Sequence, residues 1–275
     1  MSGIVFAGCS HTHGHGLWFY CKDIYGQYKG NQDNTPIIKD RPIHHLKYKD
    51  VLRFPRLVSH ELEMFEITRE DYSGNDEDSI EFIDQIFGAL PLNPQWSKNN
   101  YKYDEVKYII FQTSMPERSH YILPDGSKFR LSDDFNKIYE FFEKYNFINY
   151  EDYEQKLCGQ LFDRIKEIFI RYENKGIIPL IFNWSNHYNN LIEGDDYMSQ
   201  RKIYIKNKNK NKEFKSLTDV FKDDKNLSIY TDYEFFGENP PFDYHPSKKC
   251  HRIIADSIIE KIRFIEKNTL TNPYL

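Results

Sequence analysis

Residues 8–16, GCSHTHGHG, bring a hydroxyl and three imidazoles together directly after a short apolar run. Two kinds of chemistry fit this stretch. The hydroxyl of Ser10 can serve as a nucleophile. Alternatively, the imidazoles of His11, His13 and His15 can share a metal ion, because alternate residues of an extended chain point the same way.

A second group with catalytic potential lies near the other end of the sequence. Asp243 and His245 are two residues apart and are followed by Pro246 and a helical pattern. This spacing lets His245 act as a general base while a nearby carboxylate orients its ring. A serine after a first strand is often only a helix cap, and an Asp-x-His-Pro loop can be structural. The two groups together indicate catalysis more specifically than either does alone.

Short apolar runs alternate with helical patterns, which indicates an α/β fold with a mainly parallel sheet. Helices are expected where apolar residues recur at helical spacing. Gly176 is expected to cap the C-terminal end of the helix over 157–172. Reactive groups in such a sheet collect beyond the carboxyl ends of the strands, which is where Ser10 falls. The expected strands are 3–8, 64–69, 105–112, 176–184 and 226–232, and the expected helices are 80–87, 157–172 and 254–265.

The length favours one domain over residues 1–275, with insertions near 20–53, 115–150 and 190–225. Long insertions of this kind tend to form lids or partner surfaces. Part of the third, KIYIKNKNKNKEFK at 202–215, is basic and of low complexity. We interpret it as a solvated insertion rather than as an interaction loop.

The composition argues against nucleic-acid binding, membrane insertion and secretion. With 39% hydrophobic and 29% charged residues and a formal charge of -5, the chain has no basic footprint for nucleic acid. It has no membrane-length apolar run and no signal-peptide pattern, so a cytoplasmic location is expected, with a virion-associated one also open. Its four cysteines form no CxxC pair, and Cys9 is expected to pack inside, away from Ser10.

At its two ends the chain resembles the SGNH (GDSL-like) hydrolase superfamily. The first block of that family, a strand followed by Gly-Asp-Ser, is matched by IVFAGCSHTHGHGL, with Cys9 in place of Asp. The last block is matched by FDYHPSKKCHRIIADSI. The resemblance implies a flavodoxin-like three-layer α/β/α sandwich with a five-stranded parallel sheet. It also implies that Ser10 is the nucleophile, His245 the base and Asp243 its orienting acid.

The second block of the family supplies a glycine whose N–H, with that of Ser10, forms the oxyanion hole. YSGNDEDSI matches it, which implies Gly74 as the donor and Asn75 as a substrate-binding residue. His11 and His13 would then lie beside the site and shape the acyl pocket.

The third block departs from the family pattern. The family has Gly-x-Asn there, whereas this chain has IIFQTSMPER. Gln112, Thr113 and Ser114 are alternative third donors, and spacing does not choose among them. Arg118 in the same loop either binds an anionic group of the substrate or anchors the insertion near 115–150 to the rest of the fold.

The sequence thus predicts a serine esterase that works through an acyl-enzyme and needs no cofactor. The expected substrate is a small-molecule or carbohydrate ester, and carbohydrate O-acetyl groups are the target that the resemblance implies. Two alternatives stay open. One is a non-catalytic binding or virion-assembly module on the same fold, favoured by the missing Asn. The other is a metal-dependent hydrolase that uses the histidines of residues 11–15. It is disfavoured because metal hydrolases with an HxH pair after the first strand are barrels, and a (β/α)₈ barrel needs eight strands where only five are expected here. The oligomeric state is open.

Overall fold

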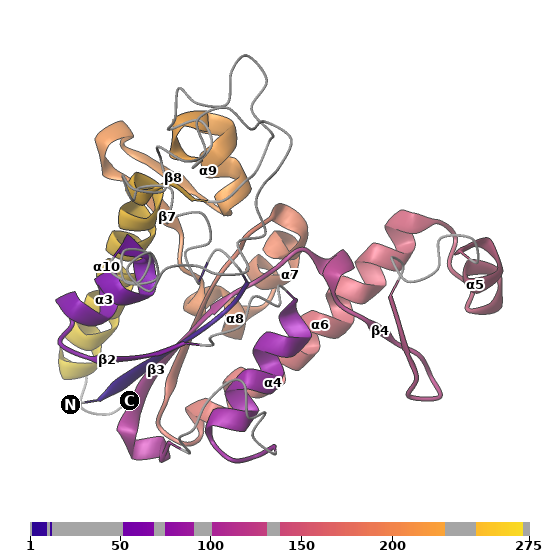
Figure 1. Ribbon diagram of the computed structural model, residues 1–275, viewed down its shortest axis with the longest axis horizontal. Coiled ribbons are helices and arrows are strands. Elements are labelled where there is room, and N and C mark those ends of the chain that lie inside the picture. The colour runs from indigo at the N-terminus through magenta and orange to yellow at the C-terminus, as the bar shows by residue number, and fades with distance from the viewer. Residues whose placement is uncertain are drawn as a thin grey trace, which may run out of the picture. The chain divides into compact units, whose positions relative to one another are not determined.

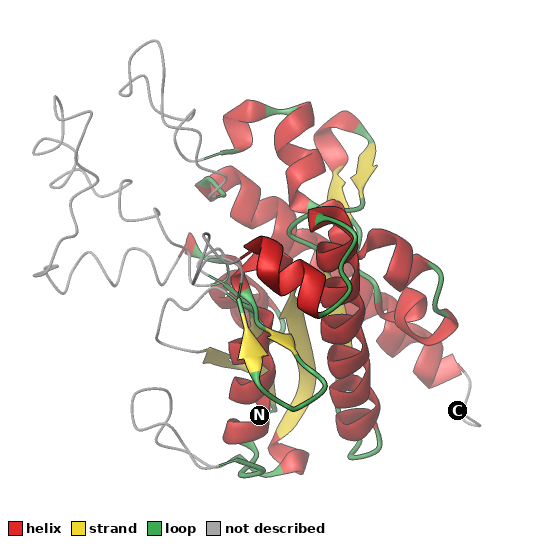
Figure 2. Ribbon diagram, turned by 90° about the vertical axis from the view of Figure 1, so that its right-hand side faces the viewer, coloured by secondary structure: helices red, strands yellow, loops and turns green. Residues whose placement is uncertain are grey.

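The computed structural model describes residues 2–9, 12, 52–68, 75–90, 101–130, 138–228 and 246–271. The chain divides into two compact units. The sheet unit comprises the described parts of Ser2–Cys9 and Ile67–Lys202, and the terminal-helix unit those of Ser10–Glu66 and Ile203–Leu275. Figure 2 shows that helices make up most of the described chain, and that its strands are confined to one sheet and short hairpins.

A four-stranded sheet of order β2-β1-β3-β6 forms the centre of the α/β fold. Val5 of β1 lies opposite Ile109 of β3 in parallel register, and Ile110 of β3 lies opposite Leu180 of β6, also in parallel. Every residue of β1 is buried, as expected for a strand covered on both faces. The predicted α/β class with a parallel sheet is therefore confirmed. The strands are β1 (Gly3–Ala7), β2 (Phe65–Thr68), β3 (Val106–Gln112) and β6 (Ile178–Phe182).

The predicted fifth strand, 226–232, is wrong in its described part. Lys225–Leu227 form a 3₁₀ turn, η8, and Ser228 makes only an isolated antiparallel bridge to Pro246. The side chain of Asp224 accepts a hydrogen bond from the N–H of Asn226 at 3.1 Å. This local bond offers the backbone an alternative to a strand. Residues 229–232 lie outside the described residues.

Two helices of the sheet unit, α4 (Asp76–Ile86) and α6 (Tyr150–Glu173), lie side by side (Figure 1). Their apolar residues fall on one face at helical spacing, as the sequence predicts. The stripe of α6 is almost wholly buried and consists of Leu157, Leu161, Ile165, Ile168 and Tyr172. The short helices α7 (Asn189–Glu193) and α8 (Asp196–Arg201) follow β6.

The predicted cap at Gly176 is confirmed at the end of α6. Gly176 has a φ of 86° and donates its N–H to the carbonyl of Glu173 at 2.8 Å, and Ile177 donates to Tyr172 at 3.1 Å. A Cβ added at Gly176 would meet nothing within 4 Å, so only the left-handed backbone resists a side chain.

We expect Gly176→Ala to lower the free energy of unfolding by about 1 to 2 kcal/mol, because a Cβ strains the left-handed conformation. Gly159 is the matched control. It lies inside α6, where an added Cβ also meets nothing within 4 Å. Gly159→Ala is expected to raise the stability by up to about 1 kcal/mol. Urea unfolding of both variants checks the contrast, and equal effects would contradict it.

The predicted insertion near 115–150 contains an antiparallel hairpin, β4 (Tyr121–Ile122) and β5 (Lys128–Phe129), and the helix α5 (Ile138–Lys144). Figure 1 shows the hairpin and α5 beside the N-terminal end of α6. Aromatic rings hold them there, with ring centroids of Phe129 and Phe141 at 3.4 Å and of Phe147 and Tyr153 at 5.3 Å.

In the terminal-helix unit, α3 (Phe54–Glu61) packs against α10 (Lys248–Thr271). The N–H of Phe54 donates to Nδ1 of His251 at 3.2 Å. Ile254, Ile258 and Ile262 are fully buried, which confirms the helical periodicity seen near the end of the sequence. Among the described residues, no helix is both long enough and apolar enough to span a membrane.

The Lys/Asn-rich segment 202–215 forms the hairpin β7 (Ile205–Asn207) and β8 (Lys212–Phe214), followed by α9 (Leu217–Asp223). Lys206 and Lys208 pair with Glu260, at 2.6 and 3.1 Å. Lys210 and Lys212 pair with Asp223. These four lysines are therefore paired with acids of the same unit, so their charges do not form an unpaired basic surface.

Candidate functional site

The carboxyl end of β1 leads into the stretch from which the sequence analysis began. Cys9 is only 1% exposed, and Nε2 of Gln112 donates to its sulfur at 3.5 Å. This burial confirms that Cys9 packs inside. The other predicted catalytic, oxyanion and metal-binding residues of the first, second and last blocks lie outside the described residues. They are Ser10, His11, His13, His15, Gly74, Asp243 and His245.

At the end of β3, the three alternative donors of the third block are all buried. The hydroxyl of Thr113 donates to Oδ1 of Asn183 at 3.3 Å and accepts from the N–H of Trp184 at 3.2 Å. It therefore ties β3 to β6. Ser114 donates its backbone N–H to Oδ1 of Asp76 at 2.6 Å, which ties β3 to α4.

Asn75 begins α4 and caps it. Its Oδ1 accepts from the N–H of Asp78 at 2.7 Å, and its Nδ2 donates to the carboxylate of Asp78 at 3.0 Å. Asn75 is therefore the N-cap of α4. The acidic residues that follow favour this end of the helix, because its free N–H groups carry partial positive charge.

Asp76 is a fully buried carboxyl that joins three parts of the sheet unit. It accepts from the N–H of Ser114 and, at 2.7 Å, from the hydroxyl of Tyr188, while its own N–H donates to the hydroxyl of Ser119 at 3.3 Å. Burial raises the pKa of Asp76 from 3.8 to about 6, although hydrogen bonds from Tyr188 and Ser114 and the charge of Arg118 oppose the rise.

This shift predicts a pH dependence of stability. Folded Asp76 holds its proton between pH 3.8 and about 6, where the unfolded chain has lost it, so the free energy of unfolding falls as the pH rises through this window. The loss is about 3 kcal/mol, at about 1.4 kcal/mol per pKa unit.

Asp76→Asn is expected to remove this part of the slope, because an amide keeps the shape of the carboxyl without a charge. Urea unfolding of both proteins from about pH 4 to about pH 7 tests it. An identical slope in wild type and variant would show that the carboxyl does not titrate in this window.

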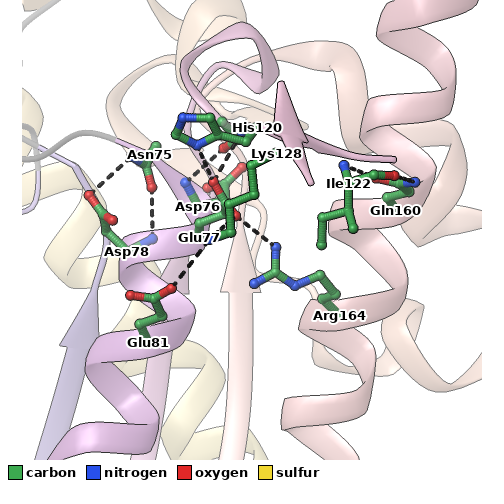
Figure 3. Close-up of polar contacts among 11 residues, drawn as sticks. Asn75, Asp76, Glu77, Asp78, Glu81, His120, Ile122, Lys128, Gln160 and Arg164 are labelled. Atoms are coloured by element: carbon green, nitrogen blue, oxygen red, sulfur yellow. Dashed lines mark hydrogen bonds and ion pairs between the residues drawn. The ribbon is translucent and has the colours of Figure 1, made fainter. Parts of the chain in front are cut away.

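Glu77, the next residue, is the centre of a polar cluster that connects three elements (Figure 3). One carboxylate oxygen accepts from the N–H of His120 at 3.0 Å and lies 2.7 Å from its Nδ1. The other accepts from Arg164 of α6 and pairs with Lys128 of β5, both at 3.2 Å. Burial alone would raise the pKa of Glu77, but the hydrogen bonds from His120 and the charge of Lys128 lower it below its ordinary value.

Arg118 lies on the 3₁₀ turn η3 (Pro116–Arg118) and is exposed. Its charge lowers the pKa of the buried Asp76 carboxyl.

A further group that the sequence analysis missed follows β6. Ser185 places its hydroxyl 2.6 Å from Nδ1 of His187, and Nε2 of His187 lies 3.5 Å from a carboxylate oxygen of Glu154 on α6. The Ser-x-His spacing at a strand end was a visible signal. The carboxylate was not, because it comes from a distant part of the sequence.

Within the described ranges, no three His, Cys, Asp or Glu side chains are grouped so that they could hold a metal ion. The comparisons with known proteins are sparse. No family model matches the chain, and no curated protein matches it.

One solved structure is similar to the chain over most of both lengths. It is a candidate lipolytic protein of the G-D-S-L family from Desulfitobacterium hafniense DCB-2, with 12% sequence identity and a TM-score of 0.41 over 95% of this chain and 99% of that one. Because the TM-score is below 0.5, the likeness carries no weight for fold or function, which depend on the residues of the chain itself.

Proposed function

We propose that the chain is a serine hydrolase that cleaves ester bonds through an acyl-enzyme. The position of β1 carries this proposal. It is an interior strand of the sheet and runs parallel to β3, and it ends at Ala7, three residues before Ser10 in the sequence. Nucleophiles of α/β hydrolytic enzymes commonly follow such a strand, at the carboxyl edge of the sheet.

In the proposed reaction, the Ser10 hydroxyl bonds to the ester carbonyl carbon while its proton passes to His245. His245 then returns the proton to the leaving alcohol, and Asp243 orients the imidazole. Water, activated by the same base, releases the acid. The N–H groups of Ser10 and Gly74 hold the oxyanion.

A third oxyanion donor is the weakest part of the proposed site. All three alternatives already have partners in the fold. The hydroxyl of Thr113 bonds Asn183 and Trp184. The side chain of Gln112 donates to Cys9, and the N–H of Ser114 donates to Asp76. The side chain of Asn75 is similarly engaged by Asp78, so any contact from Asn75 to substrate would compete with its capping bonds.

The proposed substrates are small-molecule or carbohydrate esters, including O-acetyl sugars, and no cofactor takes part. Arg118, which is exposed, would favour substrates with an anionic group. His11 and His13 would line the acyl pocket. The proposed location is cytoplasmic.

Hydrolysis of p-nitrophenyl acetate and of acetylated sugars, with and without a chelator, tests this proposal. We expect turnover that the chelator leaves unchanged and that a serine-directed fluorophosphonate abolishes. Turnover that the chelator abolishes would instead assign the site to the histidines of residues 11–15. The lack of turnover on every ester would favour the non-catalytic binding module.

A further inference from the structure

The hydroxyl of Ser185 is placed differently from that of a helix-capping serine. Ser185 precedes the 3₁₀ turn η6 (Asn186–Tyr188) but makes no capping bond from its side chain. Ser216, in contrast, begins α9 and accepts from the N–H of Asp219 at 3.3 Å, as capping serines usually do. The hydroxyl of Ser185 instead lies 2.6 Å from Nδ1 of His187.

Glu154 lies beside the other ring nitrogen of His187. Its carboxylate lies 3.5 Å from Nε2 of His187, and a carboxylate can only accept a hydrogen bond. It therefore favours the tautomer with the proton on Nε2, which leaves Nδ1 free to accept the proton of the Ser185 hydroxyl. The same carboxylate stabilises the imidazolium that forms when this proton is transferred. Distances of this kind often shorten when substrate binds.

A partly buried network of amide side chains holds the turn that carries Ser185 and His187. Nδ2 of Asn183 donates to Oδ1 of Asn189 at 2.7 Å, and Nζ of Lys202 donates to the same oxygen at 3.2 Å. Nδ2 of Asn189 donates in turn to Asn186 at 2.6 Å. A nucleophile on so fixed a turn keeps its geometry through a reaction.

The neighbouring thiol does not compete with Ser185. Cys158 lies one helical turn from Glu154 on α6, and burial, with the charges of Glu154 and Asp76, raises the pKa of Cys158 to about 12. It stays a thiol at neutral pH, and the thiol form is a poor nucleophile.

We propose that Ser185, with His187 as base and Glu154 as the residue that positions it, is a second acyl-accepting site, independent of Ser10. The Ser185 oxygen bonds to the carbonyl carbon of an ester while its proton passes to His187. The ester C–O bond then breaks, and the leaving alcohol takes that proton. Water, deprotonated by His187, releases the acid. Because Ser185 is only 3% exposed, the donors are esters of small acids that enter beside His187, whose side chain is 32% exposed.

The test uses the full chain carrying Ser10→Ala, so its outcome does not depend on the proposed function. The chain is treated with a small alkyl fluorophosphonate, and the adducts are located by proteolysis and mass spectrometry. We expect an adduct on Ser185. Ser216 is the internal control, because it is also buried and its hydroxyl donates to a carboxylate oxygen of Asp219 at 3.0 Å. It is expected to stay unlabelled.

Two further variants in this background test the roles of the partners. His187→Gln is expected to lower the labelling rate of Ser185 by about 10²-fold, the usual contribution of a positioned base. Glu154→Leu is expected to lower it by about tenfold, and Glu154→Asp to restore most of the loss, which a purely structural role would not do. Circular dichroism confirms folding. An unlabelled Ser185 in the folded chain, or labelling that His187→Gln leaves unchanged, would overturn the proposal.

Discussion

Replacing Ser10 by alanine is expected to lower kcat/KM for p-nitrophenyl acetate by at least about 10³-fold. The alanine removes the atom that forms the acyl-enzyme at this site, which leaves the contribution of the oxyanion donors and any slower turnover at Ser185. His245→Ala should cost about as much, because nucleophile and base act as a unit. Initial rates at saturating and limiting substrate would separate the effects on kcat and KM.

Cys9→Ala is the matched control for this prediction. Cys9 directly precedes Ser10 but is buried in the sheet unit, so its loss is expected to leave most of the activity. Hydrolysis that remains in Ser10→Ala and disappears when Ser185→Ala is added belongs to the second site. Full activity in Ser10→Ala would contradict the proposed nucleophile, and activity lost only in Cys9→Ala would assign the reaction to the thiol.

The second large effect is on stability. Glu77→Gln is expected to lower the free energy of unfolding by about 2 to 3 kcal/mol, less than for a fully buried ion pair because its partners are partly exposed. The amide has only one oxygen that can accept, so the bonds from either Arg164 or His120 are lost. Because the pKa of Glu77 is lowered in the fold, the wild type holds its advantage above pH 4.5 and loses it as the pH falls through the folded-state value.

Glu81→Gln is the control for this prediction. Glu81 lies on the same helix and meets Lys128 only at 3.8 Å, with 37% of its side chain exposed. It is expected to change the stability by no more than about 0.5 kcal/mol. Urea unfolding at neutral and acidic pH measures both variants. If Glu77→Gln proves as mild as Glu81→Gln, the cluster of Figure 3 does not hold α4 to its neighbours.

The sequence predicted the fold best where apolar residues alone decide the structure. β1 and β3 are apolar on both faces, and α6 and α10 carry long apolar stripes, so their patterns were unambiguous. The prediction failed at 226–228, where a hydrogen bond from the N–H of Asn226 to the side chain of Asp224 stabilises a turn in an apolar-looking segment. Local polar chemistry of this kind is poorly visible in hydrophobic periodicity.

In the candidate site, features that depend on neighbouring residues were also easier to predict than those that depend on distant ones. The burial of Cys9 follows from a local rule and was predicted, whereas Asn75 was predicted to bind substrate and caps α4 in the structure. The roles of Asp76 and Glu77 were not, because two acids at the start of a helix resemble ordinary first-turn residues. Their partners come from distant segments, as Tyr188 does for Asp76, and a single sequence does not reveal such pairs.

Trapping the acyl-enzyme would show directly whether Ser10 is the nucleophile. The chain would be mixed with p-nitrophenyl acetate, quenched in acid during turnover, digested, and examined by mass spectrometry with fragmentation that separates Ser10 from Cys9. We predict an acetyl group on Ser10 that forms within one turnover and is lost as substrate is exhausted. Turnover without any acetyl group on Ser10 would contradict the account.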